Sequence, residues 1–299
     1  MVRANRQFAA GGSADPGSAP GPREDGIWAR SPVIVLGYPY CGAARLRQLL
    51  SGHTALACTS GTGLLPLCEV AAATWRQVEG RQGALSPLAA ASIRALTGSL
   101  ITTALAGTGK LRWCEVAFAR PSSAEVFLQV YPSARFICMH RQWLDVVREA
   151  IQANPWGLAD SPFQSFAYGY PGNSVAAVAA HWAASTEPLL EFERAHLRAC
   201  YRVRHDDLVS RPAQVLDEVC AFLALDRPEQ ATAPWSDDAA SPVAVETEAS
   251  PAGPIPLERI PPPLMSVLDR LMAAIGYPPS DGSRSPDVSS PRLQAPSGT

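Results

Sequence analysis

The sequence predicts an α/β fold in which helices cover both faces of a central parallel sheet, giving a domain of three layers. Between residues 31 and 228, short β-like runs alternate with helical patterns. Long helices between successive strands are typical of parallel sheets, because a parallel crossover needs a long connection. The chain has 299 residues, 47% of them hydrophobic, which is enough for a sizeable core. We therefore expect a single domain over residues 31–277.

Four short apolar runs predict the strands of this sheet. They are Val33–Leu36, Leu111–Glu115, Ala134–Met139 and Ala199–Val203. Longer stretches with helical periodicity predict the helices. They are Ala43–Ser51, Ser86–Leu105, Ser122–Val130, Leu144–Gln152, Val175–His196, Pro212–Leu223 and Pro262–Ile275. Because proline lacks a backbone N–H, Pro188 predicts a kink in the fifth helix or a break one turn earlier.

Three segments have the composition of disordered chain. Residues 1–30, 231–254 and 278–299 are rich in small residues and proline. We expect a disordered N-terminal tail, a flexible connection within the domain and a disordered C-terminal tail.

The charge balance argues against several classes of partner. A formal net charge of −2 gives no reason to expect nucleic acid or an anionic membrane. We expect no apolar run long enough to cross a bilayer, and the N-terminal residues lack the apolar core of a signal peptide. Seven scattered cysteines without CxxC spacing predict reduced thiols and no metal site. We expect a cytoplasmic protein without a bound metal.

The basic residues are almost all arginine. Of 25 basic residues, only Lys110 is a lysine. Together with the alanine-rich helices, this bias suggests a GC-rich bacterial genome. An anion site in this chain therefore has to be built from arginine, backbone amides or helix ends.

The segment VIVLGYPYCGAARLRQLL, residues 33–50, has the outline of a phosphate-binding loop. Gly37 and Gly42 stand at GxxxxG spacing between a strand and a helix. The basic and hydroxyl residues usual in such loops are absent, however. A helix N-terminus can still bind an anion through its backbone amides, whatever the side chains are.

Four segments in order resemble the sulfotransferases that use 3′-phosphoadenosine 5′-phosphosulfate (PAPS) as donor. The first is the strand–GYPYCG–helix unit. The others are YPSARFICMHRQWLDVV, VAAHWAAST followed by YRVRHDDLVSRP, and ERIPPPLMSVLDRLMAAIGY. They span about residues 33–277. The resemblance implies a P-loop NTPase-like sulfotransferase fold.

The resemblance also implies a donor loop from Gly37 to Arg45 that binds the 5′-phosphosulfate. It contains Gly37, Tyr38, Pro39, Tyr40, Cys41, Gly42, Ala43, Ala44 and Arg45. The family's basic residue corresponds to Tyr40, its serine to Cys41, and its two threonines to Ala43 and Ala44. Arg45 has two open interpretations, a phosphate contact or a solvated residue of the first helical turn.

At the other end of the donor, Arg141 corresponds to the family arginine that binds the 3′-phosphate. The usual companion serine is replaced by Glu149. A carboxylate about 5 Å from a phosphate would repel it by a few kcal/mol at an intermediate dielectric constant. Glu149 has the alternative of pairing with Arg141 or Arg148, and Arg141 has the alternative of pairing with Asp145.

Three residues are candidates for the base that deprotonates an acceptor hydroxyl. Glu69 corresponds to a glutamate of some bacterial members, and Glu115 lies at the end of a predicted strand. His140 adjoins Arg141 and is preferred over the other histidines. For each carboxylate, a solvated or ion-paired structural role is the alternative.

An aromatic loop follows the helix that contains Glu149. Its rings are Trp156, Phe163, Phe166, Tyr168 and Tyr170. Such a loop suits a flat, apolar acceptor. A hydrophobic cluster without a ligand is an equally good interpretation.

Three functions follow from these observations. The first is transfer of a sulfuryl group from PAPS to a hydroxyl of a small molecule, such as a secondary metabolite. The second keeps the fold but runs PAPS-independent elimination, cyclisation or hydrolysis in a biosynthetic pathway. The third is a non-catalytic binding protein. Family resemblance favours the first function, and the replaced side chains favour the second.

Overall fold

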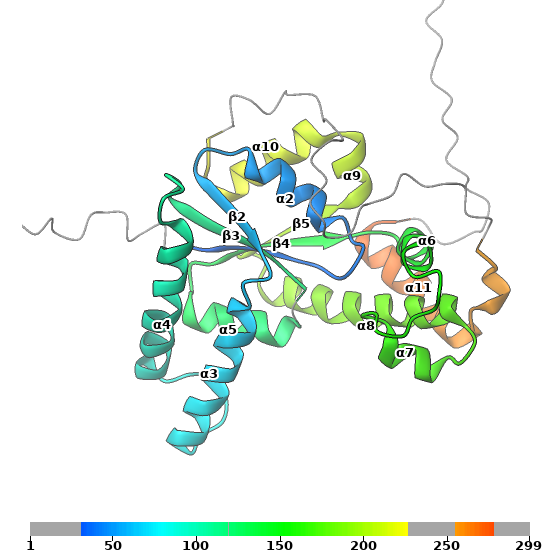
Figure 1. The fold of residues 1–299 in the computed structure, drawn as a ribbon, viewed down its shortest axis with the longest axis horizontal. Coiled ribbons are helices and arrows are strands. Elements are labelled where there is room, and N and C mark those ends of the chain that lie inside the picture. Colours follow the sequence, from blue (N-terminus) through cyan, green and yellow to red (C-terminus); the bar gives the residue numbers. More distant parts are fainter. Residues whose placement is uncertain (1–30, 119, 227–254, 278–299) are drawn as a thin grey trace, which may run out of the picture.

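The computed structural model describes residues 31–118, 120–226 and 255–277, and these form an α/β fold around one parallel sheet (Figure 1). The sheet has five strands in the order β2-β3-β1-β4-β5. Their bounds are β1 Val33–Leu36, β2 Leu56–Ser60, β3 Arg112–Ala117, β4 Arg135–His140 and β5 Cys200–Arg204. All pairings are parallel. The predicted fold class is confirmed.

The four predicted strands are confirmed with small shifts at their ends, but the sequence did not predict β2. This edge strand reads LACTS, and its exposure increases toward Ser60. A strand that is half polar gives a weak pattern by itself. It forms because β3 supplies hydrogen-bond partners, with Cys58 paired to Cys114.

Helices connect the strands and cover both faces. Their bounds are α2 Ala43–Ser51, α3 Leu64–Glu79, α4 Pro87–Leu105, α5 Pro121–Val130, α6 Trp143–Ala153, α7 Gln164–Gly169, α8 Ser174–Ala195, α9 His205–Ser210, α10 Pro212–Leu223 and α11 Pro262–Ile275. A short 3₁₀ helix covers Leu257–Arg259. The seven predicted helices are confirmed, while α3, α7 and α9 were not predicted.

The alternation of side chains along each strand divides the core into two parts. On β1, Val33 and Val35 pack with α2, α6, α10, α11 and the first part of α8. Ile34 and Leu36 point to the other face and pack with α3, α4 and α5. Figure 1 shows α2 and α10 on one side of the sheet and α4 and α5 on the other. The three predicted layers are therefore present.

Helix α8 continues through Pro188 as one helix of 22 residues, so the predicted break is wrong. The residues just beyond the proline, Leu189, Leu190 and Phe192, are buried. Their burial offsets the backbone hydrogen bond that Pro188 cannot donate.

Helix α4 corrects a second expectation. It is long and apolar enough to span a bilayer by length and composition, with a mean hydropathy of 1.4. Only one face packs on the core, through Ala89, Ile93, Thr97 and Ile101. A single such helix does not by itself assign the chain to a membrane. The predicted tails 1–30 and 278–299 and the connection 231–254 lie outside the described residues.

Candidate functional site

The predicted donor loop joins β1 to α2 at the carboxyl edge of the sheet. β1 lies between β3 and β4, and this is where the strand order changes direction and where open α/β sheets bind ligands. Gly42 is the residue before α2 and has a left-handed backbone, with φ at 89°. No side chain caps α2, and its first turn contains no acidic residue. The amides at this helix start therefore form a neutral-to-positive surface suited to an anion.

The loop is fixed to the end of β4 through Tyr38. Its hydroxyl donates to the carbonyl oxygen of Arg141 (3.0 Å) and accepts from the Arg141 backbone N–H (2.9 Å). The indole N–H of Trp182 donates to the same hydroxyl and to the Arg141 carbonyl. Tyr38 and Trp182 are buried, so these bonds hold the loop and Arg141 in one rigid unit.

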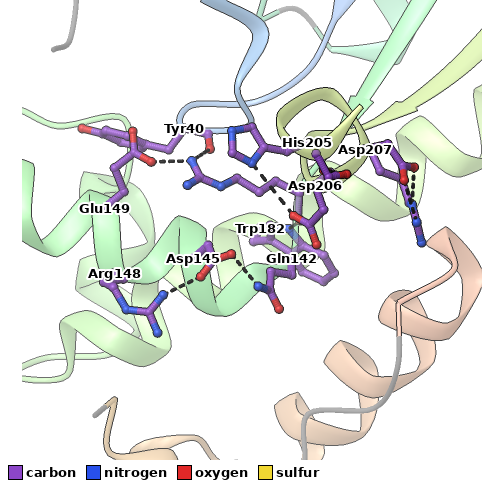
Figure 2. A network of polar contacts seen from close by, with 12 residues as sticks. Tyr40, Gln142, Asp145, Arg148, Glu149, Trp182, His205, Asp206 and Asp207 are labelled. Carbon is purple, nitrogen blue, oxygen red and sulfur yellow. Dashed lines mark hydrogen bonds and ion pairs between the residues drawn. The ribbon is translucent and has the colours of Figure 1, made fainter. Parts of the chain in front are cut away.

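Arg141 is engaged by groups of the protein itself. Its guanidinium donates to the carbonyl oxygen of Tyr40 (2.9 Å) and forms an ion pair with Glu149. The side chains of Arg141 and Glu149 are only 14% and 16% exposed. In Figure 2, Tyr40 and Glu149 lie side by side at this contact. Of the alternatives above, the structure has the Arg141–Glu149 pair.

Asp145, the other candidate partner of Arg141, forms its contacts with different residues. Asp145 pairs with Arg148 and accepts a hydrogen bond from Gln142 (2.5 Å), as Figure 2 shows. These contacts lie along the start of α6. Glu149 thus serves as the carboxylate partner of Arg141, and Asp145 serves that of Arg148.

Cys41 is a buried thiol within the loop. Burial raises the pKa of Cys41 to about 11, although nearby backbone amides act to lower it. A Cβ atom added to Gly37 would lie 2.5 Å from Cys41 Sγ. The sulfur therefore fills the inside of the loop as a neutral group at pH 7.

His205, at the start of α9, packs against Gly42 of the loop. A Cβ atom on Gly42 would lie 2.2 Å from His205 Cδ2, so only glycine fits there. Burial, followed by the charges of Arg141 and Arg45, lowers the pKa of His205 to about 4. Arg45 itself is half-buried in the first turn of α2. The sequence analysis ranked His205 below His140, and its contact with Gly42 was not predicted.

Glu115 lies within β3, two residues before the strand ends, and Glu69 lies in the second turn of α3. Glu115 is buried and accepts hydrogen bonds from the Thr62 backbone N–H and hydroxyl, both at 2.7 Å. Burial raises the pKa of Glu115, and the bonds from Thr62 oppose this effect. Glu69 is half-buried and accepts from the Ser123 hydroxyl at 2.5 Å. Glu115 thus holds the turn before α3, whereas Glu69 joins α3 to α5.

His140 is placed in the interior. Its side chain is fully buried, and Nε2 lies 2.6 Å from Glu193, which also pairs with Arg202. Burial acts to raise the pKa of Glu193, but His140 and Arg202 outweigh it and lower the pKa. This network connects β4, α8 and β5, with His140 and Glu193 buried and Arg202 reaching the surface.

The five aromatic residues proposed for an acceptor are not gathered together. Trp156 is 98% exposed and Tyr168 is 77% exposed. Phe163 is buried, and Phe166 and Tyr170 are half-buried against the core. The loop therefore contributes an inner group of rings and two outer rings.

The inner rings connect the donor loop to His181, which sequence reasoning ranked below His140. Tyr40 stacks on Phe163 with 5.9 Å between ring centroids. Phe163 and Phe166 each contact the His181 imidazole through edge-to-face packing. Burial lowers the pKa of His181, so the imidazole is neutral at pH 7. A packed aromatic cluster with one neutral imidazole thus adjoins the loop.

Within the described ranges, no group of three or more His, Cys, Asp or Glu residues is arranged to hold a metal ion. A hollow of about 490 Å³ lies near the start of β4, lined by residues that include Arg135, Arg194 and Arg198. None of the candidate site residues lines it.

Comparison with known proteins identifies the class of this chain. A model described as the sulfotransferase family matches residues 32–229, which is most of the chain. The chain therefore belongs to the sulfotransferase family, and as a member it is a transferase. The sequence matches none of the curated proteins.

Several solved structures are similar to this chain at low sequence identity. The sulfotransferase domain of the Synechococcus PCC 7002 olefin synthase is 19% identical, with a TM-score of 0.51, over 83% of this chain and 96% of that one. The sulfotransferase domain from the curacin biosynthetic pathway is 20% identical, with a TM-score of 0.47, over 66% and 74%. A sulfotransferase from Alicyclobacillus acidocaldarius is 16% identical, with a TM-score of 0.47, over 85% and 99%.

Proposed function

We propose that this protein transfers a sulfuryl group to the hydroxyl of a small molecule, with the anionic end of the donor at the start of α2. The observation that carries this proposal is the uncapped helix start after left-handed Gly42, at the carboxyl edge of the sheet. Backbone amides at such a position stabilise charge on the transferring group without any side chain.

The family donor PAPS fits this site only in part. At its 5′ end, the amides of α2 are in place, but Tyr40 stands where the family has a cation. At its 3′ end, the residues do not fit, because Arg141 is already neutralised by Glu149 and bonded to the Tyr40 carbonyl. A phosphate there would have to displace a carboxylate that is largely shielded from water.

The chain's own residues suggest how transfer would proceed. The acceptor oxygen attacks the sulfur, the bond from sulfur to the leaving oxygen breaks, and the hydroxyl proton passes to a base. The amides of α2 would hold the sulfuryl and leaving-group oxygens. The half-buried rings of Tyr40 and Phe166 would position an apolar acceptor, with buried Phe163 packed behind them. His181 is the neutral imidazole beside them.

A variant in the first turn of α2 tests this proposal. Ala44 is exposed, so Ala44→Asp places a negative charge at the helix start without a clash. We expect stability to stay equal or rise slightly, by about 0.5 kcal/mol, because the charge suits the helix dipole. Donor affinity should fall by about tenfold or more, because the aspartate competes with the anion.

The measurements are mass spectrometry of sulfated products from a panel of phenols and alcohols, and calorimetry of donor binding. Ala44→Asn, which has nearly the same shape without the charge, is the matched control and should retain affinity. If sulfated donors neither bind nor yield product with any acceptor, the proposal fails.

The Arg141–Glu149 pair favours a second candidate, a sulfotransferase-fold protein that works without PAPS or only binds a ligand. An ion pair that occupies the donor site is expected of a family member that no longer binds the donor. Turnover of an unsulfated substrate, abolished by His181→Ala, would support a PAPS-independent enzyme over a binding protein.

A further inference from the structure

Glu149 is held in place as a fixed part of the site. It lies on α6, whose residues Val146, Val147 and Ala150 are buried in the core. Its carboxylate pairs with Arg141, and both side chains are largely shielded from water. Separating the two side chains would therefore break the ion pair in a region that is largely shielded from water.

Arg141 is equally constrained. Tyr38 and Trp182 hold its backbone, and the Tyr40 carbonyl accepts from its guanidinium. The pair is thus rigidly placed relative to the donor loop. In the binding mode that the family resemblance implies, a nucleotide with its 5′ end at α2 would place its sugar at this pair.

A carboxylate and an arginine distinguish sugar hydroxyls from sugar phosphates. A carboxylate accepts hydrogen bonds from a ribose hydroxyl, whereas a free arginine accommodates a phosphate in its place. Here the arginine is neutralised, and the Glu149 carboxylate beside it is the negative group that a ribose hydroxyl or a sugar phosphate would meet. Resting on the function proposed above, we propose that Glu149 makes the site selective for a nucleotide donor with a free 3′-hydroxyl.

The donor class is then a nucleoside 5′-phosphosulfate rather than its 3′-phosphorylated form. The acceptor oxygen forms a bond to sulfur as the bond from sulfur to the 5′-phosphate oxygen breaks. The hydroxyl proton passes to the base, and the products are the sulfate ester and a nucleoside 5′-monophosphate. No oxidant or reductant is needed.

Calorimetry with unreactive nucleotides and the full chain tests the inference without relying on turnover. The probes are adenosine 5′-monophosphate, adenosine 3′,5′-bisphosphate and 3′-deoxyadenosine 5′-monophosphate. We expect the monophosphate to bind at least about tenfold more tightly than the bisphosphate, because Glu149 repels the second phosphate. The 3′-deoxy analogue should bind about tenfold more weakly than the monophosphate, because a hydrogen bond to a charged acceptor is lost.

Two variants locate the effect at residue 149. Glu149→Ser and the equally sized Glu149→Gln both release Arg141, so each should reverse the preference toward the bisphosphate. Glu187→Gln is the control, because Glu187 lies on α8 and forms a separate, exposed ion pair with Arg270. It should keep the wild-type preference, and the melting temperatures of all variants report whether they fold.

The outcomes separate this inference from the proposed function. If the wild type binds the bisphosphate as tightly as the monophosphate, selection by Glu149 is wrong, while anion binding at α2 stands. If the preference is unchanged in both Glu149 variants, the inference is also wrong. If no nucleotide binds to any variant, the nucleotide-donor function fails and the inference fails with it.

Discussion

The two ends of the proposed donor site are formed by different chemical groups. The loop before α2 presents backbone amides, whose position depends on Gly42 and on the contact between Tyr38 and Arg141. The other end depends on the side-chain charge of Arg141, which Glu149 compensates. The loop therefore keeps the backbone geometry that we propose binds an anion, although the side chains usual in the family are replaced. At the arginine, by contrast, a single carboxylate changes the chemistry.

This contrast shows which parts of a binding site withstand sequence change. A helix start carries its partial charge whatever residues follow, provided that the backbone keeps its shape. A charged side chain loses its role once a fixed counter-charge adjoins it. The three predictions below test the backbone end, the bond between the two ends, and the histidine that closes the loop.

The largest effect is expected from Gly42→Ala. Alanine would adopt a left-handed backbone and would press its Cβ atom against the His205 ring. We expect the free energy of unfolding to fall by about 3 kcal/mol or more, from backbone strain and overpacking together. Denaturant unfolding measures this loss, and calorimetry should show weaker anion binding.

Gly80→Ala is the matched control for this change. Gly80 also has a left-handed backbone, with φ at 62°, but has open space around its Cα atom. It should lose only about 1 kcal/mol. Equal losses at the two positions would mean that His205 does not restrict residue 42.

A smaller effect is expected from Tyr38→Phe, which removes the hydroxyl that joins the loop to β4. The buried Arg141 N–H then lacks an acceptor, and the Trp182 indole loses one of its two. We expect a loss of about 2–3 kcal/mol in the free energy of unfolding, because an unmade buried hydrogen bond costs its full desolvation.

Tyr131→Phe provides the comparison, because within the described part of the chain that buried hydroxyl has a side-chain hydrogen bond to Thr97 only. Tyr131→Phe should lower the free energy of unfolding by about 1 kcal/mol. If Tyr38→Phe costs no more than Tyr131→Phe, Tyr38 does not hold the two ends of the site together.

The third prediction concerns the stability of the fold at acidic pH. The pKa of His205 is about 4 in the folded chain and about 6.5 when unfolded. Between these pH values the unfolded chain binds a proton that the folded chain does not, so stability falls as the pH falls from about 6.5 to 4. Arg141 and Arg45 add to this effect and Asp145 opposes it. The loss attributable to His205 should be on the order of 2 kcal/mol.

Unfolding free energies of wild type and His205→Gln, measured from pH 7 to 4, check this value. The variant should show a smaller decrease than the wild type over this range. Parallel profiles for the two proteins would mean that His205 is not held in its neutral form by the fold.

Part of this site could be predicted from the sequence because local patterns encode it. Gly37 and Gly42 mark the turn between an apolar run and a helix, and Arg141 follows a strand. The pairing of Arg141 with Glu149 was open, because Asp145 and Arg148 offered competing partners at helical spacing. The contact between His205 and Gly42 was not predicted, because 163 positions of sequence separate a turn residue from a loop glycine and no local pattern connects them.

The sequence alone determined the layered α/β fold, most strands and helices, and the family of this chain. Hydrophobic alternation and helical periodicity are properties of neighbouring residues, so they can be seen without a structure. Only the tertiary structure decided which carboxylate neutralises Arg141, which histidine is buried and which adjoins the aromatic rings. These outcomes depend on distances between elements that the packing of the core sets, and burial and charge at those distances control the chemistry.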